Sequence, residues 1–152
     1  MRGDALRDSL TGLLNRRGLM EELQVRPKRE VGTIAVCDVD HFKAVNDGHG
    51  HAVGDRVLKG VAASLAESVG AHQVARWGGE EFVVLLDGVK LADARVLLER
   101  ARRDLQARSF KLLETGEQLA PVTISIDVAS LNNVTPEVAI EGADRLLYEA
   151  KR

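Results

Sequence analysis

The stretch ARWGGEEF, residues 75–82, decides how the chain folds, because it places a turn between two runs that favour strands. Gln73–Trp77 and Glu81–Leu86 contain apolar and β-branched residues, and the glycine pair between them favours a tight hairpin with positive φ angles. Two adjacent acids, Glu80 and Glu81, stand at the tip of this hairpin. A plain Asn-Gly turn needs no such charge, so the acids indicate a role beyond the turn itself.

Alternating helices and strands are predicted around this hairpin. The β-branched and apolar run Thr33–Val39 predicts a buried strand, and apolar residues at helical spacing predict a helix over Asp55–Val69. The order helix, strand, helix, hairpin, helix, strand, helix predicts an α/β sandwich of the split βαβ kind with a mixed sheet. The other expected elements are helices over about Asn15–Leu23 and Leu91–Leu105, strands over Phe110–Leu113 and Val122–Ala129, and a last helix that opens at Thr135 and Pro136.

The composition is that of a single ordinary globular domain. A length of 152 residues suits one core, and 45% hydrophobic and 29% charged residues lie near globular averages. With 21 basic and 23 acidic residues the chain has no general field that favours nucleic acid, so any anionic ligand must be held locally. The lone cysteine, Cys37, lies in an apolar run, which predicts a buried core thiol and a reduced, cytoplasmic setting.

The two ends of the chain predict a piece of a longer protein. The opening MRGDALRDSLTG has no tidy helix cap, and the closing LLYEAKR stops within a helix. No apolar run reaches the roughly 20 residues of a membrane span, and the N-terminus has no signal-peptide pattern. We therefore expect residues 1–152 to form one domain, with residues 1–8 as the end of an upstream linker helix.

Acidic residues close the first predicted strand. Asp38 and Asp40 lie two positions apart, so both side chains are expected on one face of the pleat. Taken alone, such acids are common turn and cap residues. If the hairpin lies beside this strand, Asp38 and one hairpin glutamate converge on a hard cation, and Mg²⁺ suits a site of one or two carboxylates completed by substrate phosphates. The glycines Gly78 and Gly79 would let the backbone approach the ligand.

The segment His41–Asp55, HFKAVNDGHGHAVGD, follows that strand and matches neither the Walker nor the Rossmann glycine pattern. The amides of His41–Lys43 and the Lys43 ammonium can still hold phosphates, although an exposed lysine is the plainer interpretation. His49 and His51 have no further ligand at zinc spacing, so they are interpreted as structural histidines in a loop.

Asn46 and Asp55 are candidates for base recognition. Guanine presents adjacent N1–H and N2–H₂ donors that one carboxylate can accept together, whereas adenine presents an acceptor at N1 that would oppose Asp55. A site built on such pairing discriminates better than an apolar slot. As an alternative, Asp55 caps the helix that follows it.

The chain resembles the GGDEF domain family of diguanylate cyclases, which condense two GTP into cyclic di-GMP. The likeness rests on DSLTGLLNRR, DVDHFKAVNDGHGHAVGD, RWGGEEF, VTIS and ADRLLYEAKR, in that order, and covers nearly the whole sequence. It implies a ferredoxin-like core with a central mixed five-stranded sheet, as in nucleotidyl cyclases and polymerase palms. It also implies a homodimer for turnover, each domain holding one GTP, and an upstream sensor or receiver domain.

The resemblance also implies a role for each candidate residue. The metal, Mg²⁺ or alternatively Mn²⁺, would be held by Asp38, the Val39 carbonyl and Glu80, with Asp40 nearby. Phosphates would be bound by Lys43, Lys151 and the amides of His41, Phe42 and Lys43, with Gly78 and Gly79 also against the substrate. Asn46 and Asp55 would read guanine, and Glu80 and Glu81 would help to deprotonate the attacking 3′-hydroxyl.

Three departures from the family pattern bear on activity. Positions Val69–His72 replace the Arg-x-x-Asp motif of a separate product-inhibition site, so we expect that site to be absent. Asp127 stands where a glycine is usual, at a cost of about 1–3 kcal/mol if it is buried without a partner. The chain ends at Arg152, before a phosphate-binding arginine of the family.

Two other functions stay open at this point. One is a module that binds GTP or cyclic di-GMP and signals without turnover, which Asp127 and the missing arginine favour. The other is a different metal-dependent nucleotidyl cyclase or polymerase palm, which should lack the pairing of Asn46 with Asp55.

Overall fold

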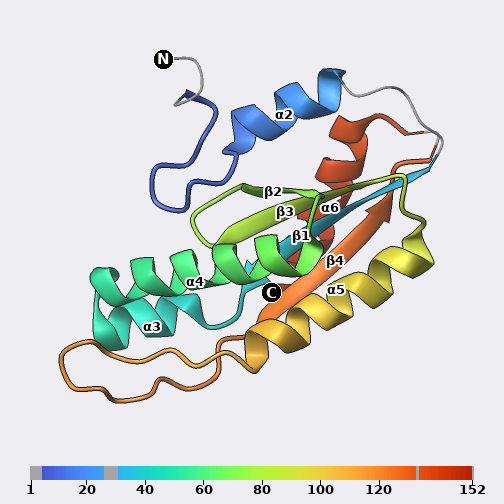
Figure 1. The fold of residues 1–152 in the computed structure, drawn as a ribbon. Helices are drawn as coiled ribbons and strands as arrows, with labels where there is room; N and C mark the ends of the chain where they lie inside the picture. The colour runs from blue at the N-terminus through green and yellow to red at the C-terminus, as the bar shows by residue number, and fades with distance from the viewer. Residues whose placement is uncertain (1–4, 26–30, 133, 152) are drawn as a thin grey trace.

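The computed structural model describes residues 5–25, 31–132 and 134–151, which form a sheet covered by helices (Figure 1). The sheet has the strand order β2-β3-β1-β4. Its strands are β1 (Gly32–Val39), β2 (Gln73–Arg76), β3 (Glu81–Asp87) and β4 (Ile124–Ser130). The helices are α2 (Arg16–Val25), α3 (Phe42–His49), α4 (His51–Val69), α5 (Leu91–Gln106) and α6 (Pro136–Lys151).

The strand order confirms the predicted split βαβ fold class. The helices α3 and α4 carry the chain from β1 to β2, and β3 then inserts between these two strands. The helix α5 leads to β4 on the other side of β1. This is the ferredoxin-like arrangement, and it places the hairpin of β2 and β3 directly beside β1.

Two details of the predicted sheet are wrong. Each neighbouring pair of described strands is antiparallel rather than mixed, and the sheet has four described strands rather than five. The predicted strand Phe110–Leu113 folds back on its own loop, where Lys111 bridges Gln118 and the Leu119 amide donates to Phe110 at 2.8 Å. The Phe110 ring packs where a β-carbon of Gly60 would stand, so this loop is fastened to α4 instead of entering the sheet.

The segment after β1 is helical, although its middle was interpreted as a loop. It forms α3 and the start of α4, which Gly50 separates with φ 88°. Most residues of this segment are polar or glycine, so its apolar face is narrow and the helical periodicity is weak. Phe42 and Val45 form that face and pack against the core. Asp55 therefore lies inside α4, not at its start, and the cap interpretation is wrong.

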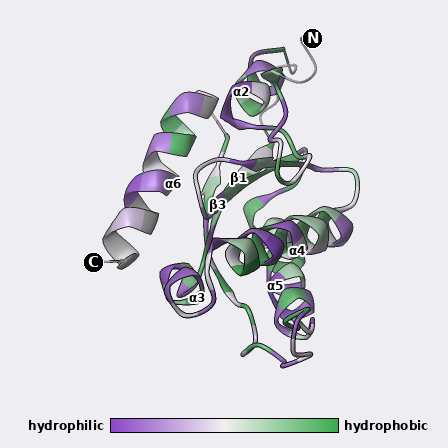
Figure 2. Cartoon of the chain, turned by 90° about the vertical axis from the view of Figure 1, so that its left-hand side faces the viewer, coloured by the Kyte–Doolittle hydropathy of each residue, from purple (hydrophilic) through white to green (hydrophobic). Residues whose placement is uncertain are grey.

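Both faces of the sheet are covered, which makes this a three-layer structure. Figure 2 shows α6 on one side of the strands and α4 with α5 on the other. Ile34 and Val36 of β1 pack with residues of α2 and α6, whereas Ala35 and Cys37 pack with residues of α4 and α5. Because β1 is buried on both faces, its sequence is a continuous apolar run rather than an alternating one.

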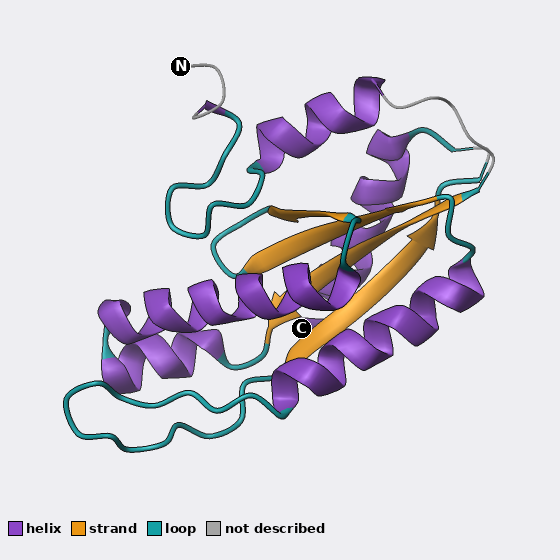
Figure 3. Cartoon of the chain, in the orientation of Figure 1, coloured by secondary structure: helices purple, strands orange, loops and turns teal. Residues whose placement is uncertain are grey.

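The long connection between α5 and β4 runs beside α3 (Figure 3). Val45 and His49 of α3 line a small cavity together with residues 119–123 of this connection. Within the described ranges, no helix combines the length and the apolar character that crossing a bilayer requires.

Candidate active site

The hairpin tip meets the end of β1, as the sequence predicts for a shared cation. Asp38 lies directly opposite Glu81 across the β1 and β3 pair. One residue further on, the Val39 amide donates a hydrogen bond to the Glu80 carbonyl at 3.1 Å. Residues about forty positions apart in the sequence are thus adjacent at one edge of the sheet.

Asp38 is almost completely buried, at 1% exposure. A buried carboxylate is costly unless a cation or hydrogen bonds stabilise its charge. Glu80 and Glu81 are half-buried at the mouth of this site, so a ligand reaches them from solvent. Carboxylate and carbonyl oxygens, the types that Asp38, Val39 and Glu80 carry, are the donors that hard divalent cations prefer. Within the described ranges, no group of three or more His, Cys, Asp or Glu side chains is arranged so that it could hold a metal ion.

One of the two predictions for the glycines of the turn is wrong, and Gly78 has a steric role. Neither Gly78 nor Gly79 has a positive φ angle, so the prediction of a tight positive-φ turn is wrong. The amides of Trp77 and Gly78 donate to the Glu81 carbonyl at 2.8 and 3.2 Å and close a wider loop. A β-carbon on Gly78 would lie 2.6 Å from Oε1 of Glu81, so the glycine makes room for that carboxylate.

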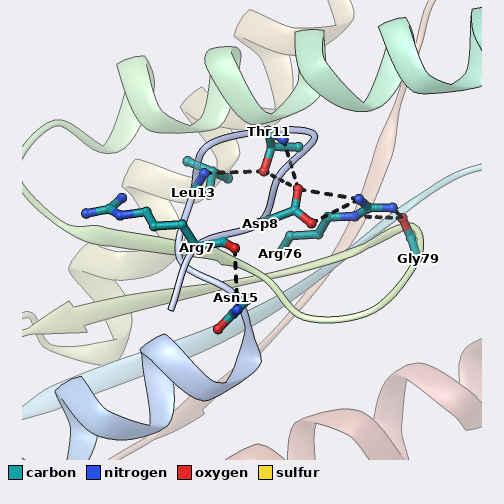
Figure 4. Close-up of polar contacts among 7 residues, drawn as sticks. All are labelled: Arg7, Asp8, Thr11, Leu13, Asn15, Arg76 and Gly79. Atoms are coloured by element: carbon teal, nitrogen blue, oxygen red, sulfur yellow. Dashed lines mark hydrogen bonds and ion pairs between the residues drawn. The ribbon is translucent and has the colours of Figure 1, made fainter. Parts of the chain in front are cut away.

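Arg76 links the hairpin to the N-terminal segment (Figure 4). Its Nη2 and Nε atoms donate to the Gly79 carbonyl at 2.8 and 3.2 Å. Its Nη1 atom lies 3.2 Å from Oδ1 of Asp8, and Asp8 in turn accepts hydrogen bonds from the amide and hydroxyl of Thr11. One guanidinium therefore ties residue 8 to the loop that carries the acids.

The ion pair has an electrostatic consequence for Asp8. Partial burial by itself raises the pKa of this carboxyl, but the hydrogen bonds from Thr11 and the charge of Arg76 outweigh that effect. The pKa of Asp8 therefore lies below its usual value, and the side chain is ionised at neutral pH. Asp8 and Arg76 were not among the predicted site residues, because nothing in their local sequence reveals a contact across 68 positions.

Backbone contacts reinforce this link. Leu14 forms a parallel bridge with Ala75, and the Arg76 amide donates to the Leu14 carbonyl at 2.8 Å. The side-chain amide of Asn15 donates to the Ala5 carbonyl at 2.9 Å. The segment before α2 thus lies along the free edge of β2, next to the hairpin.

Asp40 is held by the neighbouring strand. Its carboxylate accepts hydrogen bonds from the hydroxyls of Thr123 at 2.7 Å and Ser125 at 2.6 Å. These contacts orient Asp40 toward β4, so Asp38 is the strand-end acid that lies directly opposite the hairpin. The sequence showed the VTIS run that contains both hydroxyls but not what they bind.

The start of α3 exposes backbone amides beside this edge. His41 has φ 56° and ψ 27°, the one left-handed residue other than glycine in the part of the chain that the structure describes. This conformation turns the strand sharply into the helix, and histidine is among the residues that tolerate it. No side chain caps the first amides of α3, and Lys43 is exposed. These groups are available to an anion.

Asn46 and Asp55 lie on neighbouring helices. Asn46 is half-buried on α3 and its Oδ1 atom is buried, whereas Asp55 is exposed on α4. His49 and His51 end α3 and begin α4 and are both exposed, so their interpretation as loop residues is wrong. Lys151 ends α6, and its side chain lies outside the described part of the structure.

Two residues of the sheet bear on earlier expectations. Cys37 is fully buried, and burial together with the charges of Asp38 and Asp127 raises the pKa of its thiol to about 12. The burial confirms the predicted core thiol. Asp127 lies opposite Val36 on the edge strand β4 and is only half-buried, so its desolvation cost is smaller than for a fully buried carboxylate.

The chain is similar in sequence to known diguanylate cyclases. The family model described as "Diguanylate cyclase, GGDEF domain" matches residues 5–152. The diguanylate cyclase DgcP of Pseudomonas aeruginosa is 44% identical over 99% of this chain, and the response regulator PleD of Caulobacter vibrioides is 39% identical over 97%. The chain spans 23% and 34% of the lengths of these two relatives, so it corresponds to one part of each.

Solved structures show the same fold. The coiled coil and GGDEF domain of DgcB from Caulobacter crescentus, in complex with c-di-GMP, matches with a TM-score of 0.88 at 31% identity, over 99% of this chain and 83% of that one. The diguanylate cyclase SiaD from Pseudomonas aeruginosa, in complex with its activator SiaC, also matches with a TM-score of 0.88, at 38% identity over 99% of this chain and 60% of that one.

Proposed function

The chain belongs to the GGDEF family of diguanylate cyclase domains, and from this premise we propose that it condenses two GTP into cyclic di-GMP. The observation that carries the proposal is the meeting of the hairpin tip with the end of β1, where Asp38 faces Glu81 and Val39 bonds to Glu80. The proposal is supported by Asp38, Glu80 and Glu81 at this meeting point and by Lys43, Asn46 and Asp55 on α3 and α4, the two helices that follow β1.

A divalent ion, Mg²⁺ with Mn²⁺ as the alternative, would be held by Asp38, the Val39 carbonyl and Glu80. When bound, such an ion supplies charge stabilisation to the reacting phosphate. The buried position of Asp38 supports this assignment, since a cation offsets the cost of its buried charge.

The substrate would be held by two further groups. Uncapped amides from His41 to Lys43, with the Lys43 ammonium, would bind the phosphates of GTP, and the same role is assigned to Lys151, the last residue of α6. The exposed carboxylate of Asp55 would accept the N1–H and N2–H₂ donors of guanine. Because Asp55 lies within α4, it is not engaged as a cap and remains available to a base.

The reaction joins two GTP molecules held by two domains. The 3′-oxygen of one GTP attacks the α-phosphorus of the other, the bond to the β-phosphate breaks, and pyrophosphate leaves. Glu80 and Glu81 would help to take the proton of the attacking hydroxyl, and Lys43 would stabilise the charge on the leaving phosphates. A second, reciprocal step closes the ring, so the two domains face each other about a two-fold axis.

The setting of the domain follows from its family. We propose that it works in the cytoplasm as the output part of a longer bacterial signalling protein with an upstream sensor or receiver domain. Because Val69–His72 lack the Arg-x-x-Asp motif, product inhibition should act by cyclic di-GMP rebinding the GTP half-site. Such inhibition is competitive with GTP, and noncompetitive inhibition would indicate a second product site.

A binding module without turnover is the second candidate, and Asp127 is the observation that favours it. This carboxylate stands in β4, in which Ser125 donates to Asp40, as does Thr123 just before the strand. A domain of this kind would bind GTP or cyclic di-GMP and signal to a partner.

One experiment separates these functions. The protein is incubated at high concentration with GTP and Mg²⁺, and the nucleotides are then separated by chromatography. Cyclic di-GMP that appears with the wild type and disappears with Glu80→Ala supports the cyclase. Bound but unconverted GTP, even in a protein forced to dimerise, supports the binding module, and equal conversion of ATP points to a different cyclase.

A further inference from the structure

Gly54, near the start of α4, provides the space that Asn46 of α3 occupies. A β-carbon on Gly54 would overlap the Oδ1 atom of Asn46 and lie 3.0 Å from its Cγ. The same β-carbon would lie 3.2 Å from Cζ of Phe42, one helical turn before Asn46. Two side chains of α3 therefore rest on one glycine of α4, and any larger residue there must displace Asn46.

The contact also sets which end of the Asn46 amide faces outward. Its Oδ1 atom is buried and accepts no hydrogen bond from the described residues, although the residue as a whole is only half-buried. The carbonyl end is turned toward Gly54, and the amide nitrogen is the other branch of the same planar group. A buried acceptor without a partner is unusual in a folded protein and is found where another requirement fixes the side chain.

Resting on the proposed function, we propose that Gly54 is a positioning residue for nucleotide recognition. By seating the Asn46 carbonyl against α4, it directs the amide NH₂ toward the base, where it donates to O6 of guanine. Asp55, the residue after Gly54, accepts from N1–H and N2–H₂ on the same edge of the base. Adenine carries an amine in place of O6 and an acceptor in place of N1–H, so it opposes both groups.

Binding of 3′-deoxy-GTP in the presence of Mg²⁺ tests this role, because the analogue lacks the attacking hydroxyl and cannot react. Gly54→Ala should weaken its binding about five- to tenfold, the loss expected for one neutral hydrogen bond. The ratio of its affinity to that of 3′-deoxy-ATP should fall as well. Gly48→Ala is the matched control, since Gly48 lies on α3 near Asn46 and a β-carbon there meets nothing within 4 Å. Its affinity should stay within about twofold of wild type.

A double-mutant cycle separates positioning from a general structural effect. Asn46→Ala should weaken binding as much as Gly54→Ala, and the double variant should lose no more than either single variant. The double variant also removes the overlap, so it should unfold at the temperature of Asn46→Ala.

The inference is overturned if Gly54→Ala binds like wild type, if the two losses multiply, or if Gly48→Ala is equally impaired. A wild-type protein that does not bind 3′-deoxy-GTP overturns the proposed function itself. The two failures are therefore distinguishable.

Discussion

The Nη1 atom of Arg76 lies 3.2 Å from Oδ1 of Asp8, although 68 residues separate them in the sequence. The same guanidinium donates two hydrogen bonds to the Gly79 carbonyl, at the tip of the hairpin. Both side chains are about one-fifth exposed or less, so this pair is partly shielded from solvent. Arg76 therefore connects the N-terminal segment to the turn that carries the acidic residues.

Removing the Asp8 side chain should make the hairpin loop less rigid without abolishing nucleotide binding. We expect Asp8→Ala to reduce the rate of cyclic di-GMP formation about threefold to tenfold, because Arg76 loses the partner that orients it toward Gly79. Binding of 3′-deoxy-GTP should change less than the turnover rate does. Steady-state assays and calorimetry measure the two quantities.

The matched control is the exposed pair of Glu99 and Arg102 on α5, with 2.7 Å between Oε1 and Nη2. Glu99→Ala removes exposed ion pairs with Arg102 and Arg103 within α5, none of which involves a hairpin residue, and should leave turnover unchanged. Equal losses in both variants would contradict a specific role for Asp8.

Glu80 should be indispensable for turnover. Glu80→Gln keeps the size of the side chain but removes the charge at the hairpin tip, so we expect cyclic di-GMP formation to fall at least about 100-fold. The thermal unfolding temperature should stay within a few degrees of wild type, because Glu80 is only half-buried. A variant that keeps a tenth or more of the wild-type rate would remove Glu80 from the catalytic set.

Gly78 should be intolerant of a side chain for a steric reason. In Gly78→Ala the new methyl group would lie 2.6 Å from Oε1 of Glu81, so that carboxylate must move. We expect turnover to fall about tenfold or more, the scale on which small displacements of catalytic groups act. Gly142→Ala on α6 is the control, because a β-carbon there meets nothing within 4 Å. An active Gly78→Ala variant would show that the position of Glu81 is not critical.

Cys37 should make the protein less stable in alkali. The pKa of its thiol is about 12 in the folded protein, against an ordinary value of 9.0, so the unfolded chain releases this proton first. The stabilisation is complete below about pH 9 and is lost as the pH rises from 9 toward 12. Urea unfolding of wild type and Cys37→Ala at pH 8 and pH 10.5 should show a smaller alkaline loss in the variant.

A second measurement uses the reactivity of the same thiol. Alkylation of native Cys37 at pH 8 should be slow, because a thiol of raised pKa and no exposure presents almost no thiolate. The rate should rise sharply in urea. Rapid alkylation of the native protein would contradict the buried, neutral thiol.

The features that depend on neighbouring residues could be predicted from the amino-acid sequence. The apolar run that became β1, the strands on either side of the glycine pair and the helical spacing in α4 and α5 each carry their own periodicity, so their existence and order could be predicted. The family motifs also placed Asp38 and the hairpin acids in one site, and the register of β1 with β3 brings those segments together.

Contacts between residues that are distant in the sequence depend on how the helices and strands pack together. The pairing of Asp8 with Arg76, the hydroxyls that hold Asp40 and the contact of Asn46 with Gly54 involve different elements and leave no local pattern. The number and direction of the strands were decided in the same way, since Phe110 packs on Gly60 rather than pairing in the sheet. Periodicity reports which face of an element is apolar, whereas packing between elements selects the residues that meet there.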